Sequence, residues 1–185
     1  MMTLAIKLIV LAAITGNLLA FAWAIKKHFT RPEGLPPVMR VITLLGYLFG
    51  IGLLVVHAFA REWLLWRVVV GLMLCAVSSW LFLAALRANQ AQPLSVAGSK
   101  DQPRHLNRAG PYARIRHPFY TSYLCTWVGA GIISAHAWML IPAVVMGSLY
   151  WHIARAEERK FLSSPLADSY RAYRQQTGLF WPRVF

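Results

Sequence analysis

Charged side chains, and acidic ones above all, are scarce in this sequence. Of its 185 residues, 14% are charged and 58% are hydrophobic, and only 6 are Asp or Glu against 19 Lys or Arg. The mean hydropathy of +0.49 is too high for a globule that must cover its surface with polar groups in water. The composition therefore excludes an ordinary soluble enzyme and favours a protein embedded in a membrane.

Cysteine is also rare, and other common signals of function are missing. The only two cysteines, Cys75 and Cys125, both lie in apolar stretches, without the spacing of metal ligands. We therefore predict no metal site and interpret both as small buried side chains. The sequence has neither an internal repeat of 20–50 residues nor a G-x-G-x-x-G dinucleotide fingerprint.

What the sequence has instead is long uncharged stretches. Four of them contain no Lys, Arg, Asp or Glu: residues 8–25, 41–60, 68–86 and 117–154. A hydrocarbon layer of about 30 Å takes about 20 helical residues, so each of the first three can cross a bilayer once. The fourth is long enough to cross twice, with a turn at the small and polar residues around His136.

These stretches predict an all-α polytopic membrane protein with five transmembrane helices. Their expected positions are about residues 4–25, 39–60, 64–87, 117–134 and 137–158. The first three form one unit, residues 1–87. Residues 88–116 are a long polar connection, and residues 117–185 combine a helical hairpin with a C-terminal helical segment.

The basic residues predict how the chain is oriented in the membrane. Nearly all of them lie between the first and second spans, between the third and fourth, or after the fifth; Lys7, Arg61 and Arg67 are the exceptions. By the positive-inside rule, the N-terminus is outside, and the connection 88–116 and the C-terminus are cytoplasmic. The net charge of +13 thus reflects topology, and we predict no nucleic-acid partner.

The densest group of reactive side chains lies where the polar connection meets the fourth span. It contains Gly110-Pro111-Tyr112 and Arg116-His117-Pro118-Phe119-Tyr120. Pro118 suits the first turn of a helix, which places His117 at the N-cap and leaves unpaired N–H groups at the helix start. With Arg116 and His117 alongside, this end can bind an anion. The alternative is a set of interfacial anchors.

Two adjacent carboxylates, Glu157 and Glu158, stand at the end of the fifth span. Acidic residues are poor membrane anchors, and the C-terminal end of a helix disfavours negative charge, so a functional role is plausible beside the alternative of a solvated face. If the last two spans form a hairpin, their cytoplasmic ends are neighbours. Arg116 and His117 would then lie near Glu157.

The Gly-Pro-Tyr element, the Arg-His-Pro-Phe-Tyr element and the acidic pair together resemble the isoprenylcysteine carboxyl methyltransferase family and its bacterial relatives, over about residues 105–183. The resemblance implies an integral-membrane methyltransferase, in the bacterial inner membrane, that binds S-adenosylmethionine at the cytoplasmic ends of its last two spans. With Arg116 added for its charge, the implied cofactor-binding residues are His105, Leu106, Tyr112, Arg116, His117, Pro118, Phe119, Tyr120 and Glu157.

Methyl transfer is an in-line displacement that needs positioning and exclusion of water, so it requires no nucleophilic side chain. An amine or thiol acceptor would lose a proton, which His117, His152 or Glu158 could take. The eukaryotic enzymes of the family carry a substrate-binding arginine shortly before the acidic pair, and the nearest one here is Arg155. We therefore name three catalytic candidates: His117, Arg155 and Glu158.

The sequence thus predicts a membrane methyltransferase that acts on a lipophilic or small apolar acceptor, with membrane lipids as partners. Three alternatives stay open. The protein could be a phospholipid N-methyltransferase, or an NADPH-dependent membrane reductase with a basic, Tyr-rich cytoplasmic end. It could also be a non-enzymatic adaptor whose basic connections bind anionic lipid headgroups.

Overall fold

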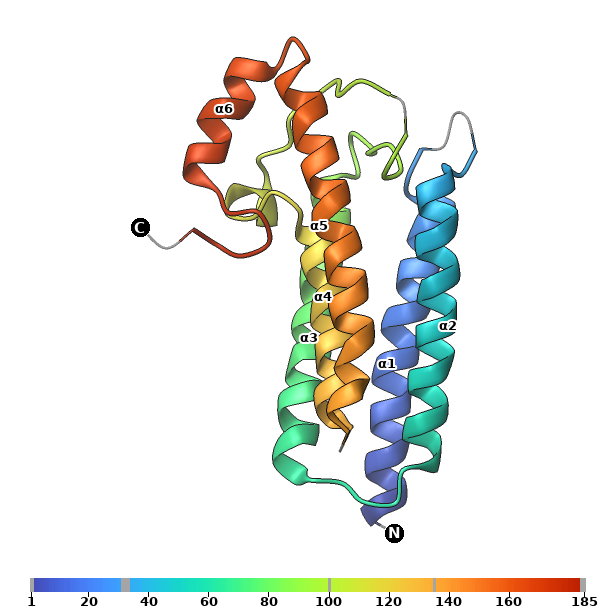
Figure 1. Ribbon diagram of the computed structural model, residues 1–185. Helices are drawn as coiled ribbons and strands as arrows, with labels where there is room; N and C mark the ends of the chain where they lie inside the picture. Colours follow the sequence, from blue (N-terminus) through green and yellow to red (C-terminus); the bar gives the residue numbers. More distant parts are fainter. Residues whose placement is uncertain (1, 31–33, 100, 135, 184–185) are drawn as a thin grey trace.

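The computed structural model describes residues 2–30, 34–99, 101–134 and 136–183, and their secondary structure is helical apart from two isolated bridges. Helices α1 to α5 run side by side, and α6 lies beyond one end of them (Figure 1). The elements in chain order are α1 (Met2–Lys27), α2 (Pro37–Phe59), α3 (Leu65–Ala88), η1 (Gly110–Ala113), α4 (Pro118–Ile133), η2 (Ala137–Leu140), α5 (Ile141–Leu162) and α6 (Ala167–Gln176).

The bundle has the dimensions and surface of a multi-pass membrane protein. The segments long and apolar enough to cross a membrane are Leu4–Lys27, Pro37–Phe59, Leu65–Ala88 and Ala137–Leu162. Their outer faces expose large apolar side chains that only lipid would cover. The predicted all-α membrane fold is therefore confirmed, with four such spans.

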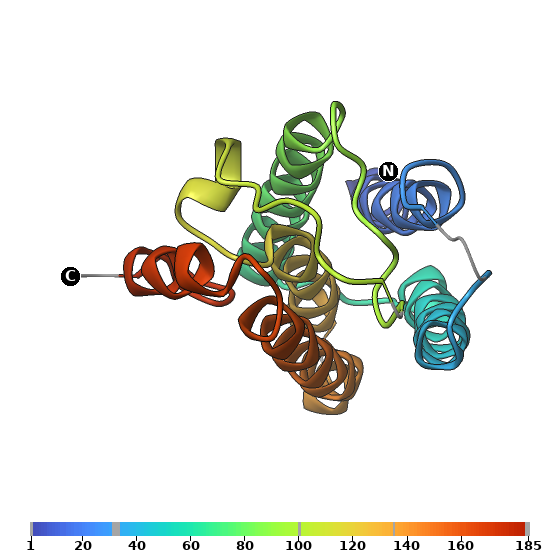
Figure 2. The same cartoon turned by 90° about the horizontal axis from the view of Figure 1, so that it is seen from above.

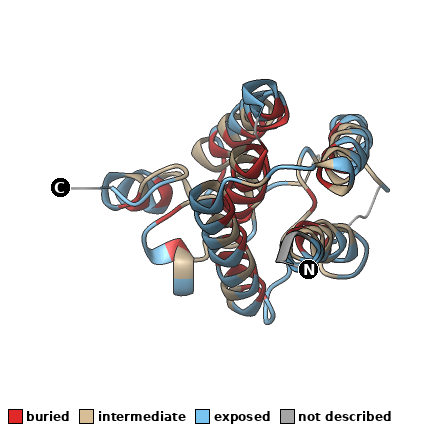
Figure 3. Cartoon of the chain, turned by 90° about the horizontal axis from the view of Figure 1, so that it is seen from below, coloured by how far each residue is buried: buried red, intermediate tan, exposed pale blue. Residues whose placement is uncertain are grey.

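The fifth predicted span, α4, is shorter than the others. Its 16 residues make about 24 Å of helix, less than the hydrocarbon layer of about 30 Å. Seen along the bundle, α4 lies in the middle, between α3 and α5 (Figure 2). Most of its residues are buried, whereas the neighbouring helices are buried only on their inner faces (Figure 3). A count of five spans stays a prediction.

Helices α3 and α4 approach each other closely because glycines face each other where they cross. A Cβ atom added at Gly71 would lie 2.6 Å from the carbonyl oxygen of Gly129, which leaves no room for a side chain. Buried polar contacts then join α1 to this pair. The Asn17 amide donates to the carbonyl of Cys75 at 3.1 Å and to the hydroxyl of Thr126 at 3.0 Å. Such contacts hold helices together in lipid.

The connection between α3 and α4 closes one end of the bundle. It is tied to the end of α1, because the N–H of Thr30 donates to the carbonyl of Leu94 and the N–H of Val96 donates to the carbonyl of Thr30, both at 3.0 Å. Gly98, with φ of 73°, lies against α2 so closely that a Cβ atom would be 2.3 Å from Val38 Cγ1. We call this end, where α4 begins and α5 ends, the site end.

Candidate functional site

A cavity of about 860 Å³ lies at the site end and extends into the bundle. Its volume is within the range of about 300–1,000 Å³ that is usual for small-molecule sites. The connection, α4 and α5 each contribute to its wall. All of the residues that the sequence predicts for cofactor binding line it: His105, Leu106, Tyr112, Arg116, His117, Pro118, Phe119, Tyr120 and Glu157.

A proline and a pairing with the C-terminal segment fix the start of α4. His117 occupies the N-cap position and Pro118 the first turn, as the sequence predicts. The N–H of Arg116 donates to the carbonyl of Gly178 at 2.9 Å, and the N–H of His117 donates to the carbonyl of Leu179 at 3.1 Å. These two donors are therefore not among the N–H groups left to bind an anion.

Glu157 lines the cavity from the last turns of α5 and contacts two side chains at the start of α4. The hydroxyl of Tyr120 donates to its Oε1 at 2.9 Å, and His117 Nδ1 lies 3.4 Å from its Oε2. The hairpin of α4 and α5 thus brings His117 to Glu157, as predicted. About 29% of the Glu157 side chain is exposed, so the carboxylate can accept further hydrogen bonds from a ligand.

Aromatic rings fix the side chains around Glu157. The rings of His117 and Tyr120 are stacked with their centroids 5.5 Å apart, and those of Tyr120 and Tyr150 at 5.4 Å. The ring of Phe180, in the C-terminal segment, meets both His117 and Tyr120 edge to face. The stack offers flat apolar faces that suit a heterocycle.

Two buried imidazole nitrogens in the cavity wall have no partner among the described residues. They are Nε2 of His117 and Nε2 of His105. Leaving such a group unsatisfied costs about 1–3 kcal/mol. Within the described part of the chain, both nitrogens thus lack the polar partner that a buried imidazole nitrogen needs, although their side chains line the cavity.

Tyr112 is positioned by asparagines that sequence reasoning did not select. The amide of Asn89 donates to the Tyr112 hydroxyl oxygen at 2.9 Å, and the amide of Asn107 donates to Asn89 Oδ1 at 3.0 Å. Burial raises the pKa of Tyr112 well above its ordinary value, so the hydroxyl keeps its proton. Among the described residues that proton has no acceptor, which leaves it available to a ligand.

The end of α6 holds Tyr112 from the other side. The hydroxyl of Tyr173 donates to the carbonyl of Tyr112 at 2.6 Å, and burial raises the pKa of Tyr173 to about 12. Both tyrosines and Tyr170 line the cavity. Helix α6 is therefore part of the site wall.

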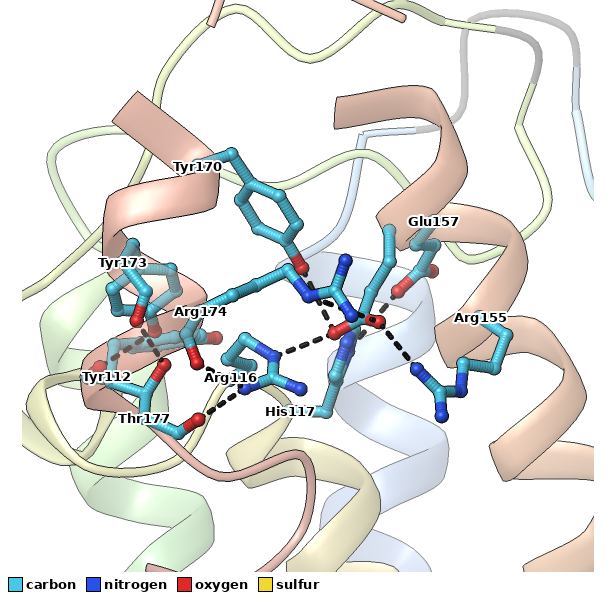
Figure 4. Close-up of polar contacts among 10 residues, drawn as sticks. Tyr112, Arg116, His117, Arg155, Glu157, Tyr170, Tyr173, Arg174 and Thr177 are labelled. Carbon is cyan, nitrogen blue, oxygen red and sulfur yellow. Dashed lines mark hydrogen bonds and ion pairs between the residues drawn. The ribbon is translucent and has the colours of Figure 1, made fainter. Parts of the chain in front are cut away.

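Glu158 does not line the cavity and lies among arginines. Figure 4 labels the side chains that contact its carboxylate: Arg116, Arg155, Tyr170 and Arg174. Its carboxylate is 2.6 Å from Arg116 Nε, 3.2 Å from Arg155 Nη1 and 3.9 Å from Arg174 Nε, and it accepts a hydrogen bond from Tyr170 at 3.2 Å. Of the two glutamates, only Glu157 lines the cavity. Glu158 instead joins the start of α4 to α5 and α6.

Of the three catalytic candidates, only His117 lines the cavity. Arg155 points away from it and lines a separate hollow on the outer face of α5, together with His152. Arg116 borders the cavity, but its guanidinium donates to Glu158 and to the carbonyl of Thr177. It therefore joins Glu158 to the C-terminal segment.

Deeper in the bundle the cavity wall becomes apolar. There it is lined by α1 and α2 on one side and by α4 and α5 on the other, through Leu18, Ile42, Leu54, Trp127 and Met146 among others. Gly46 and Gly50 of α2 widen this part because they carry no side chain. The cavity thus joins a polar end to an apolar branch.

A comparison with protein families agrees with this geometry. Residues 66–169 match the family described as phospholipid methyltransferase. The match covers more than half of the chain, from the start of α3 into α6, and includes both glutamates. A helical membrane bundle with such a match is an integral-membrane methyltransferase. The chain belongs to the phospholipid methyltransferase family, which is related to the predicted isoprenylcysteine carboxyl methyltransferases. No curated protein matches the chain.

Proposed function

We propose that the protein transfers a methyl group from S-adenosylmethionine to a lipophilic acceptor at the cytoplasmic face of the membrane. The proposal rests on one observation. A single cavity is lined by Glu157, His117 and Tyr112, and it continues into an apolar branch between the helices.

The hydrogen-bonding groups of the polar end fit the chemistry of S-adenosylmethionine. Glu157 can accept hydrogen bonds from a ribose diol or an amine, and Tyr112 can donate one to a carboxylate or a ring nitrogen. The aromatic stack around Tyr120 suits an adenine. The cofactor, when bound, supplies an activated methyl group on a sulfonium centre.

The residues around the cavity account for the remaining requirements of methyl transfer. Tyr120 fixes the carboxylate of Glu157 through a hydrogen bond of 2.9 Å, which holds the polar wall in one geometry. The connection, fastened to α1 and α2, covers the site end and excludes water. His117 is the only one of the three catalytic candidates that lines the cavity, and it is therefore our candidate for taking a proton from an amine acceptor.

The apolar branch supports an acceptor with a hydrocarbon part. Side chains of α1 and α2 provide a surface against which an acyl chain can pack, with the reactive group held at the polar end. A phospholipid amine meets these requirements and agrees with the description of the family.

The site end faces the cytoplasm in this proposal. Basic residues gather at this end, including Lys27 at the end of α1 and Arg87 at the end of α3. The opposite end carries Arg61 and Arg67 near the start of α3. By the positive-inside rule, the richer end is cytoplasmic. The cofactor would thus enter from the compartment in which it is made.

Calorimetric titration of the full chain in detergent tests the cofactor. We expect S-adenosylmethionine and S-adenosylhomocysteine to bind with one site per chain, and NADPH not to bind. Methyl-labelled cofactor should then label an extractable lipid when membranes containing phosphatidylethanolamine are supplied. Binding of NADPH alone would contradict the proposal, as would binding of none of the three.

A variant that fills the apolar branch tests binding of the acceptor separately from binding of the cofactor. Gly46 lines the cavity, and an added Cβ atom meets nothing within 4 Å, so Gly46→Leu can fold and occupy the branch. We expect kcat/KM for the lipid acceptor to fall by about tenfold or more, with unchanged affinity for S-adenosylmethionine.

Gly52→Leu is the matched control, since Gly52 also has open space around it and does not line the cavity. It should leave both quantities unchanged. An equal loss of turnover in the two variants, or a loss of cofactor affinity in Gly46→Leu alone, would show that the branch does not hold the acceptor.

A further inference from the structure

A second hollow, of about 370 Å³, lies on the outer face of α5 beside α6. It shares no lining residue with the large cavity. The residues that line it are Trp151, His152, Arg155, Glu158, Arg159, Leu162 and Arg174. The proposed methyl transfer makes no use of this hollow.

The hollow contains more positive charge than its one carboxylate can balance. Arg155, Arg159 and Arg174 face it, whereas Glu158 is the only acidic residue in its wall and also pairs with Arg116. The side chain of Arg159 has no hydrogen-bond or ion-pair partner among the described residues, and the residue is exposed. Several guanidinium groups around a partly enclosed space form a site for an anion, and a phosphate matches their fork geometry.

The depth of the hollow in the membrane indicates where that phosphate comes from. The span Ala137–Leu162 has 26 residues, but about 20 cross a hydrocarbon layer of about 30 Å. Its last turns, with Arg155 and Arg159, therefore lie among the lipid headgroups. Trp151 is 43% exposed just below them, and the Arg155 guanidinium lies 5.5 Å from the centroid of its ring. Exposed tryptophan is typical of the membrane interface.

We propose that this hollow binds the phosphate of an anionic phospholipid from the surrounding bilayer. The headgroup lies between Arg155, Arg159 and Arg174, and the acyl chains lie along the outer face of α5 below Trp151. Since Arg155 and Arg174 come from different helices and both contact Glu158, a lipid at this position braces the end of α5 against α6. This lipid is a structural partner, distinct from any acceptor in the large cavity.

Native mass spectrometry of the detergent-solubilised full chain tests the proposal. The protein is titrated with dioleoyl phosphatidylglycerol, with dioleoyl phosphatidylcholine, and with phosphatidylglycerol in the presence of inorganic phosphate. We expect phosphatidylglycerol to bind more tightly than phosphatidylcholine, and inorganic phosphate to compete only weakly because it lacks acyl chains. If inorganic phosphate displaced phosphatidylglycerol completely, the hollow would be a site for free anions and not for a lipid.

Arg159→Gln is the most informative variant because Arg159 makes no contact that the fold needs. It should weaken the binding of the first phosphatidylglycerol by about fivefold, the effect of one basic residue near an anionic surface. Arg171→Gln removes the same charge from α6 outside the hollow and should leave binding unchanged. Equal losses in the two variants would show a general effect of charge, and equal affinities for the two lipids would also overturn the proposal.

Discussion

Glu157→Gln is expected to weaken the binding of S-adenosylmethionine by about 10- to 100-fold. A hydrogen bond to a charged group contributes about 1.5–3 kcal/mol, and the substitution removes the charge while keeping the shape. The fold should tolerate the change, because the Glu157 side chain is 29% exposed and the new amide oxygen can still accept from Tyr120. Calorimetric titration with the cofactor measures the affinity.

The control for this variant is Glu62→Gln, at the opposite end of the bundle. Glu62 is exposed and does not line the cavity, so the same chemical change there should leave the affinity unaltered. Both variants should melt at the temperature of the unaltered protein. Unchanged binding in Glu157→Gln would mean that the carboxylate does not contact the cofactor. The polar end of the cavity would then not be the cofactor site.

Much of the architecture follows from features that the sequence displays directly. Uncharged stretches of about 20 residues can satisfy their backbone in lipid only as helices, which makes the membrane fold predictable. Pro118 sets the start of α4, and the return of the chain through α5 brings Glu157 to His117. These features depend on local chemistry and on one hairpin, so no knowledge of distant contacts is needed.

Which of the two glutamates lines the cavity was not predictable in the same way. Glu157 and Glu158 are chemically alike, and the rotation of α5 about its axis decides which one meets the cavity. That rotation depends on packing against α4 and α6, which no local pattern encodes. Asn89 posed a similar problem, since an asparagine at the end of an apolar helix indicates only a C-cap. Its contact with Tyr112 depends on the path of the whole connection.

The C-terminal segment was expected to be helical, but its backbone pairing with the start of α4 was not expected. Gly178 both accepts a hydrogen bond from Arg116 and donates one to the carbonyl of Arg114, at 2.9 and 3.0 Å. A Cβ atom there would lie only 1.7 Å from the carbonyl oxygen of Trp181, so glycine is required. Backbone pairing of this kind leaves no periodic signal in the side chains, and the sequence therefore gives little indication of it.

Arg116→Gln is expected to lower the melting temperature by about 10 °C, the largest effect on stability that we predict. Glu158 is 2% exposed, and its closest ion-pair contact is with Arg116, at 2.6 Å. Removing one partner of a buried pair costs about 3–5 kcal/mol, because the other charge stays buried with weaker compensation. For a protein of this size, about 2–4 °C is lost per kcal/mol. Thermal unfolding of the detergent-solubilised protein measures the shift.

Three further variants decide whether burial of the charge is the cause: Arg171→Gln, Glu158→Gln, and the combination of Glu158→Gln with Arg116→Gln. Arg171→Gln breaks an exposed pair with Asp168 and should leave the melting temperature unchanged, because surface ion pairs contribute little. Combining Arg116→Gln with Glu158→Gln removes the stranded charge, so the double variant should lose less stability than the two single variants summed. If the losses of stability were strictly additive, Arg116 would act mainly through its hydrogen bond to the Thr177 carbonyl. The charge of Glu158 would then be stabilised sufficiently by its other contacts, with Arg155, Arg174 and Tyr170.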